Sequence, residues 1–222
     1  MRILGLASLL VSSTVWAAGP TGTIQGTVKV EKVSPDAKAV AGASGTVIYV
    51  VGFQTPPPAG VVKIIQKDKT FEPTVMPIVK GQRVAFSNAD KVRHNVFSVS
   101  QAKAFDVGIT PPGDAPKTLF DHTGKVDVFC NIHPEMSMTV LVLPNSAFAM
   151  AGADGSYSIP GVPPGEYTVY AWHRLGAPAK QRIKVTAGAT TRADWTLRLD
   201  QTVQSHLDKH GRPYKKREHY DE

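Results

Sequence analysis

Short apolar segments separated by glycine and proline run through the chain, and they constrain its fold more than any other feature. The 222 residues include 19 glycines and 17 prolines, and residues 23–30 alternate polar and apolar side chains as a half-buried strand does. Between residues 61 and 144, no amphipathic run with the helical period lasts more than about two turns. Because 42% of the residues are apolar, the chain can bury a core. The pattern therefore predicts an all-β protein.

The expected strands fall into three blocks. Residues 19–53 precede a proline-rich linker at 54–60, residues 61–145 form the middle block, and residues 146–200 form the last one. Residues 201–222 are polar and charged, and we expect a mobile tail or an extension along the surface. The strands are expected at residues 23–30, 46–51, 61–65, 76–79, 83–87, 95–98, 125–129, 139–143, 154–159, 166–172, 181–185 and 191–199.

Residues 1–18 have the layout of a secretory signal peptide. Arg2 precedes an apolar run at residues 3–15, and small residues follow at the positions that a signal peptidase reads. Cleavage is expected after Ala17 or Ala18, which places the mature protein in the periplasm or outside the cell. A buried amino-terminal helix is the alternative, but the run has no charged face. Later in the chain, no window approaches the roughly 18 apolar residues of a membrane span.

The formal net charge of +7 would ordinarily point to nucleic acid or an acidic membrane surface as a partner. The expected export removes nucleic acid from the candidate partners. We therefore expect the basic charge to steer an acidic protein partner toward this chain.

One thiol, two imidazoles and a thioether lie at a spacing that suits a metal site. Cys130, His133 and Met136 form a Cys-x2-His-x2-Met motif, so a single tight loop can present all three. His94 comes from a separate strand. Two histidines and one cysteine with a weak axial methionine describe a blue-copper electron-transfer site, because thiolate and thioether favour reduced copper and imidazole suits both oxidation states. Met138 is the alternative axial ligand. The single cysteine excludes an intramolecular disulfide.

The surrounding sequence adds a family resemblance. Residues 71–79 and 81–88, the tripeptide His94-Asn95-Val96, and the loop from residue 130 to residue 136 resemble the corresponding parts of cupredoxins, the family of plastocyanin, amicyanin and pseudoazurin. The resemblance covers roughly residues 61–145. It implies a Greek-key β-sandwich that carries one type 1 copper ion.

The same resemblance assigns roles to individual residues. It implies that His94, Cys130 and His133 are the equatorial copper ligands and that Met136 is the axial one. It also implies that Asn95 stabilises the ligand loop through hydrogen bonds, and that the edge of His133 faces solvent as the electron port.

The last block resembles a different family. Residues 154–169 look like the second half of a carboxypeptidase regulatory-like domain, a smaller transthyretin-like β-sandwich. The first half of that pattern is missing just before residue 154, but residues 22–30 and 39–51 resemble it. We therefore expect the cupredoxin to be inserted into a split sandwich, since insertion is tolerated at a loop tip. The alternative is a cupredoxin with added amino-terminal strands, followed by an independent sandwich.

The expected function is single-electron transfer by Cu(II)/Cu(I) cycling in an exported protein, with a redox protein such as a c-type cytochrome or a periplasmic oxidoreductase as partner. The whole arrangement resembles exported plastocyanin-like proteins described as methylamine-utilisation proteins. The alternative function is copper binding for delivery, storage or sensing in the periplasm. An enzyme is not expected, because multicopper oxidases use paired His-x-His motifs and none of the seven histidines is paired in that way. His122, in a turn-like sequence, is left out of the site.

Overall fold

The computed structural model describes residues 19–203 and 206–214. The signal peptide expected at residues 1–18 and the end of the tail lie outside the described residues. Within them, the chain forms seventeen strands and one short helix, α1 (Pro35–Lys38), which confirms the all-β prediction. No helix in this part of the chain is long and apolar enough to cross a membrane.

Residues 61–143 form one β-sandwich, which we call the middle sandwich. Its two sheets enclose a core of valine, isoleucine, phenylalanine and methionine side chains. The five-stranded sheet has the order β5 (Val75–Val79), β11 (Ser137–Leu143), β10 (Gly124–Phe129), β7 (His94–Ser100) and β8 (Lys103–Thr110). The four-stranded sheet has the order β4 (Thr70–Glu72), β3 (Val61–Lys67), β6 (Arg83–Asn88) and β9 (Lys117–Leu119).

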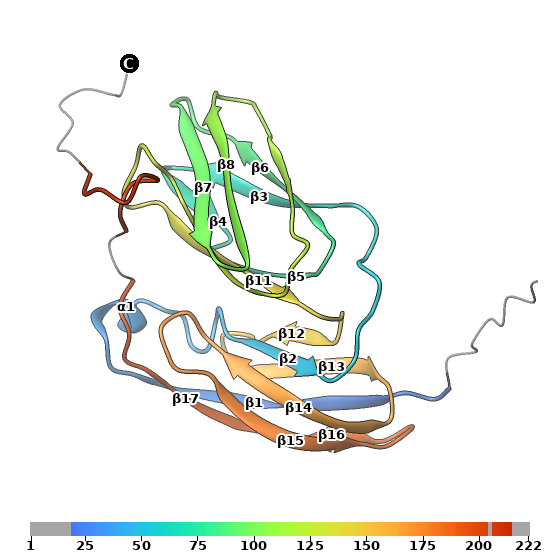
Figure 1. Ribbon diagram of the computed structural model, residues 1–222. Helices are drawn as coiled ribbons and strands as arrows, with labels where there is room; N and C mark the ends of the chain where they lie inside the picture. Colours follow the sequence, from blue (N-terminus) through green and yellow to red (C-terminus); the bar gives the residue numbers. More distant parts are fainter. Residues whose placement is uncertain (1–18, 204–205, 215–222) are drawn as a thin grey trace, which may run out of the picture.

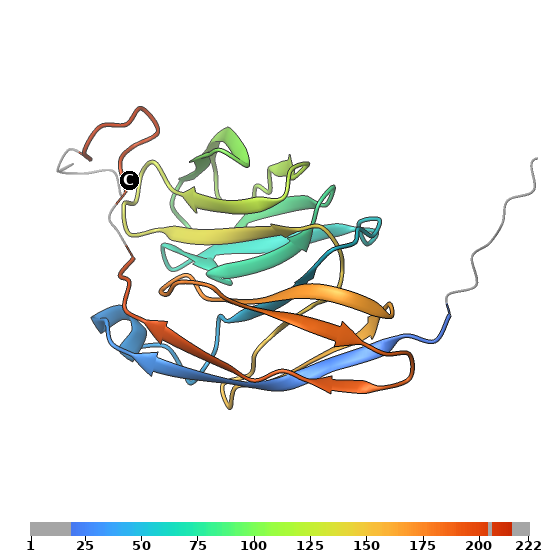
Figure 2. The same cartoon turned by 60° about the horizontal axis from the view of Figure 1, so that its bottom comes forward.

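The strands before and after the middle sandwich together form a second one, which we call the terminal sandwich (Figure 1, Figure 2). In one sheet, β1 (Gly22–Lys32) lies between β13 (Ser156–Val162) and the two strands β16 (Thr190–Arg192) and β17 (Trp195–Leu199). The other sheet has the order β12 (Phe148–Met150), β2 (Val47–Val51), β14 (Gly165–Trp172) and β15 (Ala179–Val185). In each sheet, therefore, a strand from the first block lies between strands from the last block.

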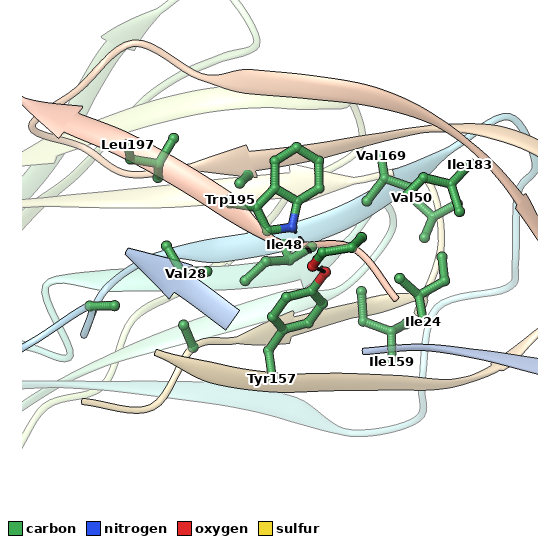
Figure 3. Packing of buried hydrophobic residues seen from close by; sticks show 14 of the residues in the cluster. Ile24, Val28, Ile48, Val50, Tyr157, Ile159, Val169, Ile183, Trp195 and Leu197 are labelled. Atoms are coloured by element: carbon green, nitrogen blue, oxygen red, sulfur yellow. Dashed lines mark hydrogen bonds between the residues drawn. The ribbon is translucent and has the colours of Figure 1, made fainter. Parts of the chain in front are cut away.

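The core of the terminal sandwich is built around a buried aromatic pair (Figure 3). The indole N–H of Trp195 donates to the hydroxyl of Tyr157 at 2.9 Å, and that hydroxyl donates to the carbonyl oxygen of Ala193 at 2.6 Å. Gly26 is required beside this network, because a Cβ there would lie 1.9 Å from the Ala193 carbonyl oxygen. The close approach lets the chain cross from β16 to β17 over the middle of β1.

The two sandwiches pack against each other through apolar side chains on facing sheets. Alternate residues of β11 point to opposite faces, so Val140 and Val142 enter the middle core while Leu141 and Leu143 face the terminal sandwich. There the two leucines pack against Trp172 of β14 and against buried side chains of β2 and β5. Strand β11 is therefore buried on both faces, which explains its nearly continuous apolar sequence.

The ends of the middle sandwich lie next to each other. The hydroxyl groups of Thr55 and Ser146 are 2.9 Å apart, and the amide N–H of Thr55 donates to the carbonyl oxygen of Pro144. The side-chain amide of Asn145 donates to the carbonyl oxygens of Val50 and Phe53 at 3.0 and 2.9 Å. The chain thus enters and leaves the middle sandwich at one place.

The pattern of short strands missed several elements. Strands β4, β8, β9 and β12 were not expected, and neither was the helix α1. β8 is an edge strand whose apolar side chains are only partly buried, with Ile109 56% exposed, so it lacks a clear inward face. The strand expected at residues 191–199 is instead divided into β16 and β17, because the chain bends at Ala193 where it passes Gly26.

Candidate metal centre

Two neighbouring strands bring the predicted ligands together at one end of the middle sandwich. His94 is the first residue of β7, and Cys130 directly follows β10. These strands are antiparallel neighbours, with Phe129 opposite Phe97, so the start of β7 lies beside the end of β10. The loop between β10 and β11, residues 130–136, then carries the remaining candidates; we call it the ligand loop.

His94, Cys130 and His133 form a compact cluster of donor atoms. One ligand atom from each residue lies within 4.8 Å of the other two, and all three residues are buried. The Nδ1 atoms of the two histidines are 3.0 Å apart, and the sulfur of Cys130 is 3.8 Å from Nδ1 of His133. The described residues give no other such group of three histidine, cysteine or carboxylate side chains. His133 retains 7% of its surface exposed, so only a small edge faces solvent.

Asp90 orients the first histidine, although no motif in the sequence marks it. Its carboxylate lies 2.8 Å from Nε2 of His94 and also accepts hydrogen bonds from the backbone N–H groups of Asp68 and Lys69, at 2.6 and 3.0 Å. Both of these residues have positive φ in the tight turn between β3 and β4, which aims the two N–H groups at Asp90. The proton of His94 is therefore held on Nε2, and the lone pair of Nδ1 points toward His133.

The charge of Asp90 follows from these contacts. Burial on its own would raise the pKa of the Asp90 carboxyl, but the hydrogen bonds from Lys69, His94 and Asp68 outweigh it and leave the pKa below its ordinary value. An ionised carboxylate behind an imidazole increases the basicity of the ring nitrogen that faces a metal.

The Cys130 sulfur has the surroundings of a metal-bound thiolate. Burial raises the pKa of the thiol above its ordinary value, although backbone N–H groups of Asn95, His133 and Ile132 point at the sulfur and favour the thiolate. The last two lie 3.4 Å from it. Three N–H donors would stabilise the negative charge of the thiolate. A cation between the sulfur and the two imidazoles would offset the cost of burying that charge. The residues present therefore fit a soft metal ion.

Asn95 contacts the site through its backbone and β8 through its side chain, and the two methionines lie in the middle core. The backbone N–H of Asn95 reaches the sulfur, whereas its side-chain amide donates to Asp106 and to the carbonyl oxygen of Gly108, both at 2.7 Å, and ties β7 to β8. Met136 ends the ligand loop, and Met138 lies two residues further on in β11; both are fully buried in the middle core.

We expect Asp90→Asn to weaken copper binding by about 10–100-fold, the usual effect of removing a partner that orients a ligand. Asparagine removes the negative charge behind His94 and no longer fixes its proton on Nε2. Competition with a chelator of known affinity measures the change. Asp68→Asn is the matched control, because Asp68 contributes a backbone N–H to Asp90 and both residue types tolerate its positive φ. Equal affinity of Asp90→Asn and wild type would contradict the role of Asp90.

Comparisons with known proteins give one family match and several similar solved structures. Residues 136–198 match the family model of the carboxypeptidase regulatory-like domain. No curated protein matches the chain. Among solved structures, the chain is similar to a purple cupredoxin from Nitrosopumilus maritimus, with 24% identity over 37% of this chain and 99% of the other, and a TM-score of 0.34.

Two further solved structures show the same kind of similarity. A methionine-to-alanine mutant of amicyanin, in its Cu(I) form, is 19% identical over 43% of this chain and 98% of its own, with a TM-score of 0.36. A copper-containing nitrite reductase from Thermus scotoductus SA-01 is 20% identical over 52% of this chain and 28% of its own, with a TM-score of 0.37.

Proposed function

We propose that the protein is an exported type 1 copper protein that transfers single electrons. The observation that carries this proposal is the convergence of His94, Cys130 and His133 in one buried cluster without a carboxylate among the three donors. These residues would be the equatorial ligands of one copper ion. Met136 would be the axial ligand, with Met138 as the alternative, because both thioethers are buried in the same core.

The chain's own contacts suit a site that changes little on electron transfer. When bound, copper would supply a one-electron Cu(II)/Cu(I) couple. Asp90 holds His94 from behind, the backbone N–H groups hold the Cys130 sulfur, and the ligand loop is anchored between two paired strands. These contacts would hold the donors in place before a metal arrives, which would limit reorganisation.

The partner would dock where the ligand loop meets solvent. Pro134 and Glu135 are exposed beside the small accessible edge of His133, and the exposed Lys91 and Arg93 precede His94. We propose that a redox protein with an acidic docking face, such as a c-type cytochrome or a periplasmic oxidoreductase, exchanges electrons there. A periplasmic or secreted location and the absence of enzymatic activity remain predictions.

Loading the protein with Cu²⁺ tests this function. We expect one equivalent to bind and to produce an intense visible charge-transfer band that disappears on reduction and returns on reoxidation. A loaded protein that stays colourless would exclude a type 1 site. Loss of the metal on each reduction would instead favour copper delivery or storage over electron transfer, and measuring copper retained after several cycles separates the two.

We also propose that the middle sandwich is a cupredoxin inserted into a split regulatory-like sandwich. The placement of β1 and β2 between strands of the last block supports this arrangement, as does the contact between Thr55 and Ser146 at the two ends of the insert. The proposed boundaries are residues 19–53 and 146–200 for the split sandwich and residues 61–145 for the cupredoxin.

A further inference from the structure

Residues 206–214, the second described part of the carboxyl-terminal tail, lie against the ligand loop; we call this segment the strap. The hydroxyl of Tyr214 donates to the backbone carbonyl oxygen of Cys130 at 2.8 Å. The backbone N–H of Lys209 donates to the side-chain oxygen of Asn131 at 2.9 Å. The ring of His206 stacks on Phe129, with centroids 4.0 Å apart and planes 24° apart. In Figure 1 and Figure 2 the red strap lies beside the end of the middle sandwich.

The strap is a folded element with its own contacts. Asp208 closes a turn in which its carboxylate accepts from the backbone N–H groups of His210 and Arg212, at 2.8 and 2.9 Å. The hydroxyl of Tyr214 also lies 3.2 Å from Nδ1 of His206, and the two rings are nearly perpendicular. Burial raises the pKa of Tyr214 above its ordinary value, so the phenol stays protonated and can donate.

A second set of contacts connects the strap to β8 and, through it, to Asn95. The ammonium group of Lys209 pairs with Asp106 on β8, and the same carboxylate accepts from the side chain of Asn95. The backbone N–H of Asn95 points at the Cys130 sulfur. The strap therefore contacts the surroundings of Cys130 by two routes. One is the hydrogen bond of Tyr214 to the backbone carbonyl of Cys130, and the other runs through Asp106 and Asn95.

We propose that the strap is a built part of the metal centre, in which Tyr214 and His206 are positioning residues that hold the start of the ligand loop closed over Cys130. Loops open locally at a lower free energy than the strands that flank them, and each contact from outside the loop makes opening rarer. The strap thereby slows access of solvent reagents to the thiol and slows release of a bound metal. The link to metal release rests on the proposed copper function, but the effect on the thiol does not.

The reactivity of Cys130 in the metal-free, full-length protein tests this proposal. An aromatic disulfide reagent that releases a coloured thiolate reports on the only thiol in the chain. When reclosing is faster than the reaction, the rate follows the population of the open loop. We expect Tyr214→Phe to raise the rate about fivefold, the effect of one net hydrogen bond. His206→Ala, which loses the ring stack and its contact with Tyr214, should raise it about tenfold.

His210→Ala is the matched control, because His210 lies in the same turn and its side chain is exposed. Its rate should equal that of wild type. Thermal midpoints of all three variants should stay at the wild-type value, because no strap residue belongs to either buried core. Equal rates in Tyr214→Phe, His206→Ala and wild type would overturn the proposal, and so would an equal acceleration in His210→Ala.

A second readout separates this proposal from the copper function. In the copper-loaded protein, transfer of the metal to an excess of chelator should be faster in Tyr214→Phe and His206→Ala than in wild type by similar factors. If copper-loaded wild-type protein shows no visible band, the type 1 site is contradicted. The thiol reaction rates of the metal-free protein then still test the strap. A normal band, together with thiol and transfer rates in both variants that equal those of wild type, would contradict the proposed role of the strap and leave the type 1 site in place.

Discussion

Replacing Cys130 with alanine is expected to abolish the visible charge-transfer band of the copper-loaded protein. The band requires a thiolate bound to Cu(II), and Cys130 is the only cysteine in the chain. Copper affinity should fall by more than about 100-fold, because even the outer partners of metal ligands are worth about 10–100-fold and Cys130 is a direct donor in the cluster. Absorption spectroscopy and competition with a chelator measure the two effects.

His122→Ala is the control for this substitution. His122 exposes 73% of its side chain and pairs with Asp121 on the surface, so its removal should leave the band and the affinity unchanged. Retention of the band in Cys130→Ala would show that sulfur does not bind the metal. Loss of the band in His122→Ala would place the metal at a surface site.

A fragment of residues 146–222 is expected not to fold by itself. It lacks β1 and β2, which lie between other strands in the two sheets of the terminal sandwich. These two strands bring Ile24, Val28, Ile48 and Val50 into the core (Figure 3). Burying four such side chains contributes about 6–12 kcal/mol, comparable with the ~5–15 kcal/mol total stability of a typical domain. Circular dichroism during thermal or urea unfolding should show no cooperative transition.

A bridged variant provides the positive counterpart. In it, a short glycine-serine linker joins Thr55 to Ser146 and replaces the whole middle sandwich. The hydroxyl groups of these residues are 2.9 Å apart, so a few residues can span the gap without strain. The variant should unfold cooperatively, although it exposes the apolar face that Trp172 and its neighbours present to the middle sandwich. Cooperative folding of the 146–222 fragment would favour an independent carboxyl-terminal sandwich and contradict the split arrangement.

Most of the strands and the candidate ligands could be proposed from local pattern, whereas four edge strands and the contacts around the site could not. Cys130, His133 and Met136 are close in sequence, so their spacing alone places them on one loop. Edge strands such as β8 were missed because an edge strand is only half buried, and its alternation is weak. The boundary between β16 and β17 was missed because the apolar alternation continues through the bend, which depends on contact with Gly26.

The sequence by itself determined the all-β class and the soft donor set, because both depend on residue types at short and regular spacing, and its resemblance to two families implied two kinds of sandwich. Only the tertiary structure showed that Asp90 contacts His94, that Tyr214 reaches the backbone of Cys130 and that His206 stacks on Phe129 just before the ligand loop. Asp90 lies four residues before His94, and Tyr214 lies in a charged tail. No sequence pattern marks the partner of either residue. Such contacts depend on which strands pair and where the chain returns, and those are set by the packing of the whole molecule.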